Sequence, residues 1–271
     1  VENHGERFTG SWIDAVYLTD NADWNAAREI WHLGNFAQSR SLGNGEKYTL
    51  TQTLPLAPSV SGRHLVVRTD IANQVGETGE TNNSRAAASL VTTQAADLRV
   101  TELRSEATAS SGEETTVTWT VGNFGAAVWS GTRGWVDAVY LSRDPEFIPE
   151  RAIPLGTFNH ANLGGLAAGD SYTTSARVRL PAGSEGRYYL YLMTDAESDV
   201  GDPRLRQSRR ELTSGDNANA REAYYARSAY EGTRNDNNLG RSLLDVAYRE
   251  PDLQIDEIVV SDRDARSGTP I

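Results

Sequence analysis

The chain has 271 residues and a mass of 29.6 kDa, enough for about two domains of roughly 100–200 residues each. Its 37 acidic residues outnumber its 26 lysines and arginines, and the resulting charge of −11 argues against nucleic acid or an anionic membrane as the main partner. No cysteine is present, which excludes disulfides and thiolate metal sites, and no apolar run approaches the roughly 20 residues of a membrane-spanning helix.

Short β-rich runs separated by turn residues follow one another along the chain. The alternation is clearest over residues 115–121, where Val117, Trp119 and Val121 share one face, as in a half-buried strand. Further strands are predicted at 64–68, 98–103, 139–141, 178–180 and 188–193, with glycine-containing turns at 110–112, 164–165, 167–169 and 181–183. About seven short strands per domain predict antiparallel β-sandwiches.

Two stretches of the chain repeat each other in order. Asp14-Ala-Val-Tyr-Leu18 recurs 123 residues later as Asp137-Ala-Val-Tyr-Leu141, and each copy follows a tryptophan, Trp12 or Trp135, at the same offset. Further matches are 45–49 with 169–173, Thr69-Asp70 with Thr194-Asp195, 1–5 with 121–125 and, at an offset of 155 residues, 97–100 with 252–255. Since aromatics in strands are core residues more often than ligand platforms, we interpret Trp12 and Trp135 as structural.

The phase of the repeat predicts where each module begins and ends. We expect residues 1–95 to be the later part of a first module without its opening strands, 96–249 to be a complete second module, and 250–271 to be the opening strands of a third. The second module carries an insertion at about 203–234, expected to be irregular or partly helical, with a short helix at 218–230. The chain starts with Val1 and its one methionine is Met193, so the sequence is expected to be an excerpt of a longer protein.

The ordered motifs carry a resemblance to a known family. They are Pro-Asp-Leu at 251–253, Val-x-Asn-x-Gly at 121–125, Asp-x-Val-Tyr-Leu-Ser at 137–142, Gly-x-x-Tyr at 169–172 and Gly-x-Tyr-Tyr-Leu at 186–190. Together they resemble the cell-adhesion-related domain of bacteria, abbreviated CARDB, over nearly the whole chain, twice, apart from the insertion. The resemblance implies an all-β fold of tandem immunoglobulin-like antiparallel β-sandwiches, an exported bacterial setting and a family that is not catalytic.

No catalytic constellation is recognisable in the sequence. The four histidines are scattered, at positions 4, 32, 64 and 160, and no nucleophile elbow, phosphate loop or His-Glu-x-x-His motif occurs. Acidic turn residues in a chain of charge −11 need no catalytic explanation. We therefore predict that the protein is not an enzyme and requires no cofactor, with calcium as the one ligand to consider.

Aspartate and glutamate gather in several of the expected turns, and this pattern suggests calcium, a hard cation that prefers several oxygen ligands from flexible loops. The candidate ligands are Asp20, Asp23, Asp70, Glu77 and Glu80 in the first module and Asp195, Asp199, Asp202 and Asp236 in the second. None of these groups matches a full EF-hand loop. The alternative is that the side chains stabilise turns through hydrogen bonds to nearby backbone groups.

The insertion combines arginine with tyrosine, which is the composition of contact surfaces, because both side chains give a large contact area and directed hydrogen bonds. The candidates are Arg209, Arg210, Tyr224, Tyr225 and Tyr230, which we expect to dock on an acidic surface of a neighbouring module or chain. A solvated loop is the alternative.

The C-terminal residues suggest a second interface. Leu253, Ile255 and Ile258 belong to an expected opening strand with nothing to pair to, and an unpaired strand invites addition to another chain. If residues 251–271 complete the first module of another copy, by chain continuity or strand addition, a head-to-tail open assembly results.

Two functions remain open from the sequence. The first is a structural or adhesive repeat module of a large bacterial extracellular or cell-surface protein, forming a rod or filament with other copies of itself or adjacent modules. The alternative is a glycan-binding or ancillary sandwich module of a secreted enzyme, with Trp24 and Trp129 as the aromatic contacts and a cell-surface or matrix glycan as partner.

Overall fold

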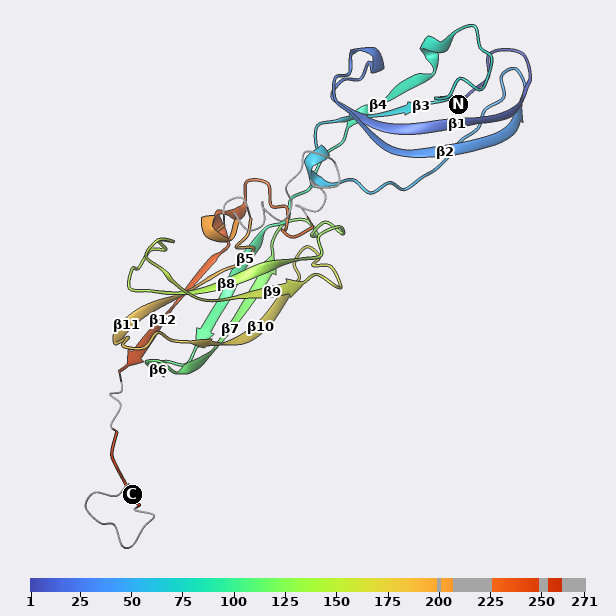
Figure 1. Ribbon diagram of the computed structural model, residues 1–271. Helices are drawn as coiled ribbons and strands as arrows, with labels where there is room; N and C mark the ends of the chain where they lie inside the picture. The colour runs from blue at the N-terminus through green and yellow to red at the C-terminus, as the bar shows by residue number, and fades with distance from the viewer. Residues whose placement is uncertain (199–200, 207–225, 249–252, 260–271) are drawn as a thin grey trace, which may run out of the picture.

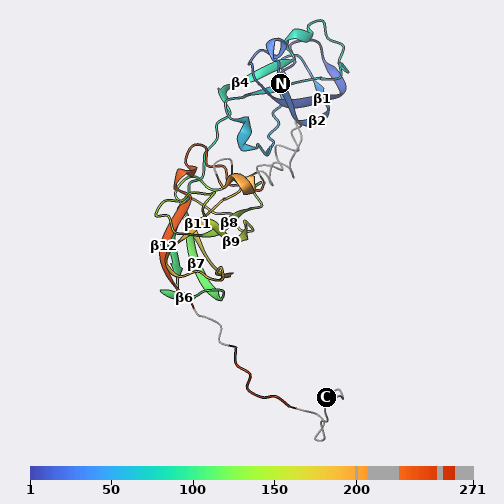
Figure 2. The same ribbon diagram turned by 60° about the vertical axis from the view of Figure 1, so that its left-hand side comes forward.

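The computed structural model describes residues 1–198, 201–206, 226–248 and 253–259. These residues form β-strands joined by turns and short 3₁₀ helices, and the predicted all-β fold with antiparallel sheets is confirmed. Figures 1 and 2 show two groups of strands, which we name the N-terminal unit (residues 1–92) and the C-terminal unit (residues 95–247). Across the described residues, no helix has the length and apolarity needed to cross a membrane.

The N-terminal unit contains a single sheet with the strand order β2-β1-β3-β4, in which all neighbours are antiparallel. Its strands are β1 (Phe8–Thr19), β2 (Ile30–Leu42), β3 (His64–Arg68) and β4 (Ser84–Leu90), with the 3₁₀ helices η1 (Trp24–Ala26), η2 (Pro58–Val60) and η3 (Glu80–Asn82). The small core gathers around Trp12, Leu42 and Tyr48. Within the described residues, no second sheet covers this one.

The C-terminal unit is a two-sheet sandwich. One sheet has the order β10-β7-β5 and the other the order β6-β12-β11-β8-β9, with β6 and β12 the one parallel pair among the described strands. The elements are β5 (Leu98–Ser105), β6 (Thr108–Ser110), β7 (Glu114–Asn123), β8 (Gly134–Ser142), β9 (Ile153–Ala161), β10 (Ser171–Arg179), β11 (Gly186–Met193), η4 (Asn235–Asn237) and β12 (Leu239–Ala247).

The two sheets of the C-terminal unit share one core. The predicted alternation of β7 is confirmed, because Val117, Trp119 and Val121 are all at most 1% exposed and face the other sheet. Leucines of β5, β11 and β12 fill the same cluster. Burying the apolar face of each sheet against the other is what stabilises a sandwich of this kind.

Two expected elements differ from the structure. Residues 253–259, the described part of the expected opening strand at 250–271, form no strand, and no described strand pairs with them. Of the expected helix at 218–230, residues 226–228 form a turn and a bend and residues 229–230 are irregular, and the rest lies outside the described residues. At the other end of the insertion, residues 203–206 are helical.

Candidate functional site

The repeated aspartate of the C-terminal unit, Asp137, is a buried hydrogen-bond acceptor. Its carboxylate receives hydrogen bonds from Trp119 Nε1 at 2.7 Å, Tyr172 OH at 2.8 Å and Thr194 Oγ1 at 2.7 Å. Burial raises the pKa of Asp137, and these three hydrogen bonds act against that effect. The side chains come from three different strands or strand ends, so the carboxylate ties the two sheets together.

Asp14 makes the same network in the N-terminal unit. Its carboxylate receives hydrogen bonds from Tyr48 OH at 2.5 Å and Thr69 Oγ1 at 2.7 Å, and Tyr48 and Thr69 stand at the repeat positions of Tyr172 and Thr194. The third donor is the indole of Trp12, at 3.1 Å, because no described residue takes the place of Trp119. Burial, followed by the hydrogen bond to Asp14, raises the pKa of Tyr48 to about 12. The duplicated sequence motif is therefore a duplicated internal scaffold.

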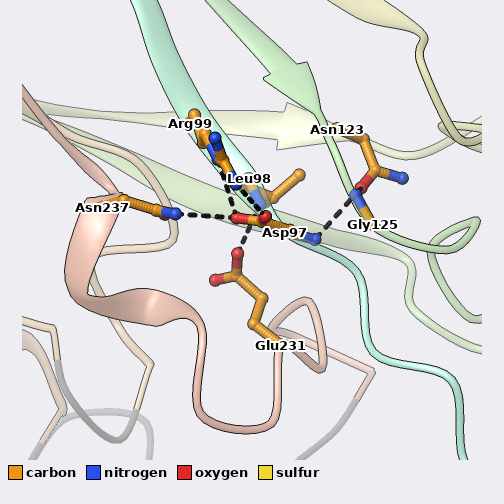
Figure 3. A network of polar contacts seen from close by, with 7 residues as sticks. All are labelled: Asp97, Leu98, Arg99, Asn123, Gly125, Glu231 and Asn237. Atoms are coloured by element: carbon orange, nitrogen blue, oxygen red, sulfur yellow. Dashed lines mark hydrogen bonds and ion pairs between the residues drawn. The ribbon is translucent and has the colours of Figure 1, made fainter.

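A second polar network anchors the first strand of the C-terminal unit, and Figure 3 shows it closely. The Asp97 N–H donates to Asn123 Oδ1 at 3.1 Å, and the Leu98 N–H donates to the Glu231 carboxylate at 2.5 Å. The Asp97 carboxylate in turn accepts a hydrogen bond from Asn237 Nδ2 at 2.9 Å. We name these five residues the β5 anchor. They hold the N-terminal end of β5 from the neighbouring strand, from the insertion and from η4.

The two carboxylates of the β5 anchor are shifted in opposite directions. The Arg99 guanidinium, 2.6 Å from Asp97, lowers the pKa of Asp97, and the Asn237 amide adds to this effect. Glu231 is only 1% exposed, and burial raises its pKa to about 7 in spite of hydrogen bonds from Asn238 and the Leu98 N–H. At the base of the strand, the pKa of Glu231 is thus raised by burial and the pKa of Asp97 is lowered by its hydrogen-bond partners.

The described end of the insertion packs against its own unit. Ser228 Oγ and the Ala229 N–H donate to the Asp195 carboxylate at 2.6 and 3.1 Å, and the Ala96 N–H donates to Tyr230 O at 2.9 Å. In the N-terminal unit the equivalent aspartate, Asp70, receives the Val75 N–H at 2.8 Å. Ala229 lies 34 residues after its acceptor Asp195, whereas Val75 lies 5 residues after its acceptor Asp70. The two separations differ by 29 residues. The 29 extra residues between donor and acceptor in the C-terminal unit correspond to the expected insertion.

The residues expected to bind calcium in the N-terminal unit hold turns. Asp20 accepts the N–H groups of Arg28 and Glu29 at 2.9 and 3.0 Å, and Asp23 caps η1 by accepting the Asn25 N–H. Asp70 accepts hydrogen bonds from two backbone N–H groups of its own turn. The other two candidates, Glu77 and Glu80, are exposed to solvent. Backbone donors therefore already occupy several of the carboxylate oxygens.

The corresponding residues of the C-terminal unit are dispersed. Asp195 binds the end of the insertion, Asp202 pairs with Arg204 at 2.7 Å and accepts Tyr140 OH at 2.8 Å, and Asp236 is an exposed residue of η4. Asp199 lies outside the described residues. In the described part of the chain, no three histidine, aspartate or glutamate side chains converge in a group that would hold a metal ion.

The expected interface residues fall in different places. Arg209, Arg210, Tyr224 and Tyr225 lie outside the described residues, and Tyr230 is half-buried, with its carbonyl on the Ala96 N–H. Leu253, Ile255 and Ile258 are 95%, 82% and 78% exposed.

The two tryptophans of the glycan alternative are both half-buried. Trp24 packs on the ring of Tyr17 at a centroid distance of 4.8 Å. The guanidinium of Arg68 lies over the Trp24 ring, 4.3 Å from the ring centroid. Trp129 folds over Gly131, where a β-carbon would touch its ring. Neighbouring side chains therefore cover part of each indole.

A shallow hollow on the C-terminal unit lies where β9 leads into β10, lined by residues 160–166 and 169–172. Its aromatic wall is His160 stacked on Tyr172 at a centroid distance of 3.7 Å. Burial lowers the pKa of His160, so the imidazole is a neutral packing group here.

The β5 anchor contains residues that the sequence did not single out as functional. Asn123 belongs to the repeated Val-x-Asn-x-Gly motif, so its recurrence as Asn3 was a usable signal. Glu231 gave no such signal, because it lies near the end of the insertion, far from Leu98 in the sequence. Its contact with Leu98 spans 133 residues of chain.

Comparisons with known proteins locate a family in the C-terminal unit. Residues 95–207 match the CARDB family model. A CARDB domain from Pyrococcus furiosus, whose structure was determined in complex with di-metal ions, is 14% identical, with a TM-score of 0.34, over 59% of this chain and 95% of that one.

Other solved structures match only in small part. β-Glucosidase 3B from Thermotoga neapolitana is 14% identical over 36% of this chain and 14% of that chain, with a TM-score of 0.26. β-Glucosidase from Listeria innocua is 14% identical over 46% of this chain and 18% of that chain, with a TM-score of 0.25. No curated protein matches the chain.

Proposed function

We propose, from the match of residues 95–207 to the model of the adhesion-related CARDB family, that the chain is a structural or adhesive repeat module of a bacterial extracellular protein. It acts without catalysis, as a rigid segment of a cell-surface or secreted rod. Its partners are other copies of itself or adjacent modules of the same type.

The observation that carries this proposal is the duplicated carboxylate network. Asp14 with Tyr48 and Thr69, and Asp137 with Tyr172 and Thr194, are the same buried arrangement in two successive units. Elongated repeat proteins contain the same structural framework in each successive repeat. Both carboxylates are buried and accept hydrogen bonds from side chains of their own unit, so we assign the repeated residues to the framework.

The course of the chain supports a rod. In both views the chain enters the C-terminal unit at the end that carries the β5 anchor and leaves it after β12, at the end remote from the N-terminal unit (Figures 1 and 2). Units that are entered and left at opposite ends propagate in one direction, and a heterologous contact between such ends gives an open assembly.

Electron microscopy of the full chain at increasing concentration tests this function. We expect linear head-to-tail particles that lengthen with concentration, with sedimentation velocity showing a matching series of species. Monodisperse monomers at all concentrations, with residues 251–271 rapidly removed by protease, would contradict the proposed assembly.

A further inference from the structure

The outer face of the N-terminal sheet, opposite the face that carries Trp12, repeats an aromatic contact of the C-terminal unit. In the C-terminal unit, Tyr140 packs against Phe147 at a ring-centroid distance of 5.0 Å, within a small buried cluster. In the N-terminal unit, Tyr17 packs against Trp24 at 4.8 Å. Trp24 follows Tyr17 by seven residues, as Phe147 follows Tyr140, so the two contacts are equivalent in the repeat.

The strand register identifies a charged member of the N-terminal contact. Arg68 pairs with Ala15 as Met193 pairs with Ala138, so a guanidinium stands where the C-terminal unit has a thioether. The Arg68 guanidinium lies over the Trp24 ring, 4.3 Å from its centroid. The indole attracts the cation but accepts no conventional hydrogen bond, so the N–H donors of Arg68 still need an acceptor.

In the C-terminal unit, the chain itself supplies a carboxylate to the equivalent tyrosine. Asp202 accepts a hydrogen bond from the Tyr140 hydroxyl at 2.8 Å and pairs with the Arg204 guanidinium at 2.7 Å. Arg204 in turn lies 5.8 Å from the ring centroid of Tyr140. Because Asp202 is only 1% exposed, the phenol, the guanidinium and the carboxylate form a closed set that leaves little room for a ligand.

The N-terminal unit has the phenol and the guanidinium without the carboxylate. Among the described residues, the Tyr17 hydroxyl and the Arg68 guanidinium have no hydrogen-bond or ion-pair partner, and Arg68 Nε is buried without an acceptor. Other arginines of the described chain, such as Arg63 and Arg99, lie beside carboxylates. An unpaired, half-buried arginine in a chain with 37 acidic residues indicates a position where a ligand supplies the acceptor.

An exposed imidazole lies beside these groups on β2. His32 pairs with Tyr17 in the ladder, and its ring centroid is 5.3 Å from that of Tyr17. Its Nε2 and Asn35 Oδ1 are 2.7 Å apart. Aromatic rings next to a polar imidazole and an amide offer both apolar contact and hydrogen bonds to hydroxyl groups. A sugar ring presents both kinds of surface.

We propose that Tyr17, Trp24, His32 and Arg68, which we name the outer-face cluster, bind a carboxylated saccharide, the uronic acid residue of a polysaccharide. The carboxylate of the ligand takes the role that Asp202 has in the C-terminal unit and accepts hydrogen bonds from the Arg68 guanidinium and the Tyr17 hydroxyl. The sugar ring packs beside the indole, and its hydroxyls reach the imidazole. The inference deepens the proposed function by giving the adhesive module a class of ligand, and it rests on that function for the extracellular setting.

The acidity of the chain is compatible with an anionic ligand at this place. Asp20 and Asp23, in the loop that carries Trp24, accept backbone N–H groups of that same loop. At physiological ionic strength, exposed charges more than about 8 Å apart are largely screened from each other. The charge of −11 therefore acts weakly on a carboxylate that is paired directly with a guanidinium.

Titration calorimetry of the full chain with an oligogalacturonate tests the site, and the methyl ester of the same oligosaccharide is the comparison ligand. The ester keeps the sugar and removes the charge. We expect saturable binding of the acid, weakened about tenfold or more by Arg68→Met and roughly fivefold by Tyr17→Phe, since each change removes a hydrogen bond to the carboxylate. We expect the ester to bind at least about tenfold more weakly than the acid.

Arg85→Met is the matched control. It removes the same charge from an exposed arginine of β4 that pairs with Val67, on the opposite face of the sheet, and it should leave the affinity unchanged. Both test substitutions suit the fold, because methionine is the residue of the C-terminal unit at this position and phenylalanine differs from tyrosine by one hydroxyl. Circular dichroism of each variant verifies this.

Four outcomes overturn the proposal. The oligogalacturonate fails to bind, its methyl ester binds equally well, Arg68→Met affects binding no more than Arg85→Met, or an oligoglutamate binds as tightly as the saccharide. The last result would show that the cluster recognises an acidic peptide or charge alone. Failure here is distinct from failure of the proposed function, because filaments seen by microscopy without saccharide binding would leave the rod and refute only this site.

Discussion

At the scale of single residues, buried carboxylates organise this protein. Asp14 and Asp137 are 4% and 1% exposed, and each receives three side-chain hydrogen bonds. A buried acceptor with several donors is costly to remove, because every donor then remains unsatisfied in the interior. This explains why the Asp-x-Val-Tyr-Leu motif is the clearest repeat in the sequence.

Removal of the Asp137 carboxylate should strongly destabilise the C-terminal unit. We expect Asp137→Ala to lower the free energy of unfolding by about 3 kcal/mol or more, because the donors from Trp119, Tyr172 and Thr194 lose their acceptor. Urea denaturation followed by circular dichroism measures the loss. Asp245→Ala, at an exposed aspartate of β12, is the matched control and should change little. Equal effects of the two substitutions would refute the assigned role.

Glu231 should make stability depend on pH. Its pKa is about 7 in the folded chain, against 4.5 for an ordinary glutamate, so between these values the folded chain holds a proton that the unfolded chain has released. The free energy of unfolding should therefore fall as pH rises from about 4.5 to about 7, by roughly 3 kcal/mol in total. Glu231→Gln keeps an uncharged side chain of similar shape and should remove this slope.

The pH effect is measured as the difference between the unchanged chain and Glu231→Gln, in urea denaturation at several pH values from 5 to 8. The difference cancels other titrating groups, such as His160, whose lowered pKa gives a slope of opposite sign. Parallel curves for the two proteins would show that the Glu231 carboxyl does not carry the effect.

At the scale of elements, the start of β5 is held by close backbone packing as well as by polar contacts. Gly125 lies against the chain that leads into β5, and a β-carbon there would be 2.6 Å from Ala95 O and 2.7 Å from Asp97 N. Those contacts are with backbone, which cannot rotate away as a flexible side chain can. Asn123 and Gly125 of the Val-x-Asn-x-Gly motif thus both contact the start of β5.

Gly125→Ala should accordingly weaken the docking of β5. We expect a loss of about 1–3 kcal/mol in the free energy of unfolding, from overpacking against fixed backbone. Faster hydrogen exchange at the Leu98 N–H should accompany it, since the bond to Glu231 is disturbed. Gly164→Ala is the control, because its β-carbon meets nothing within 4 Å, and it should have little effect. Unchanged exchange at Leu98 in Gly125→Ala would contradict this account.

At the scale of the whole molecule, the two units differ in how completely their cores are closed. The C-terminal core draws buried residues from two facing sheets, whereas the N-terminal core centres on Trp12, Leu42 and Tyr48 beneath a single sheet. Stability from apolar burial scales with the area removed from water. The N-terminal unit should therefore be the less stable of the two.

Calorimetry of the full chain should show two transitions. Asp14→Ala is expected to lower the first and Asp137→Ala the second, which assigns each transition to a unit. A single transition moved equally by both substitutions would show that the units unfold together.

Period-two alternation and repeated motifs are local signals, and they were enough to predict the all-β fold, six of the twelve described strands and the repeat. It did not determine what the repeated residues do. Asn123 and Asp97 lie 26 residues apart, and Glu231 meets Leu98 across 133, so their partnership exists only after the sheets have formed. The exposure of Val67 likewise could not be predicted from the sequence, because it depends on which residues pack against that face of the sheet. Chain pattern fixes which residues form strands, whereas tertiary packing decides which strand ends are anchored and which face stays open.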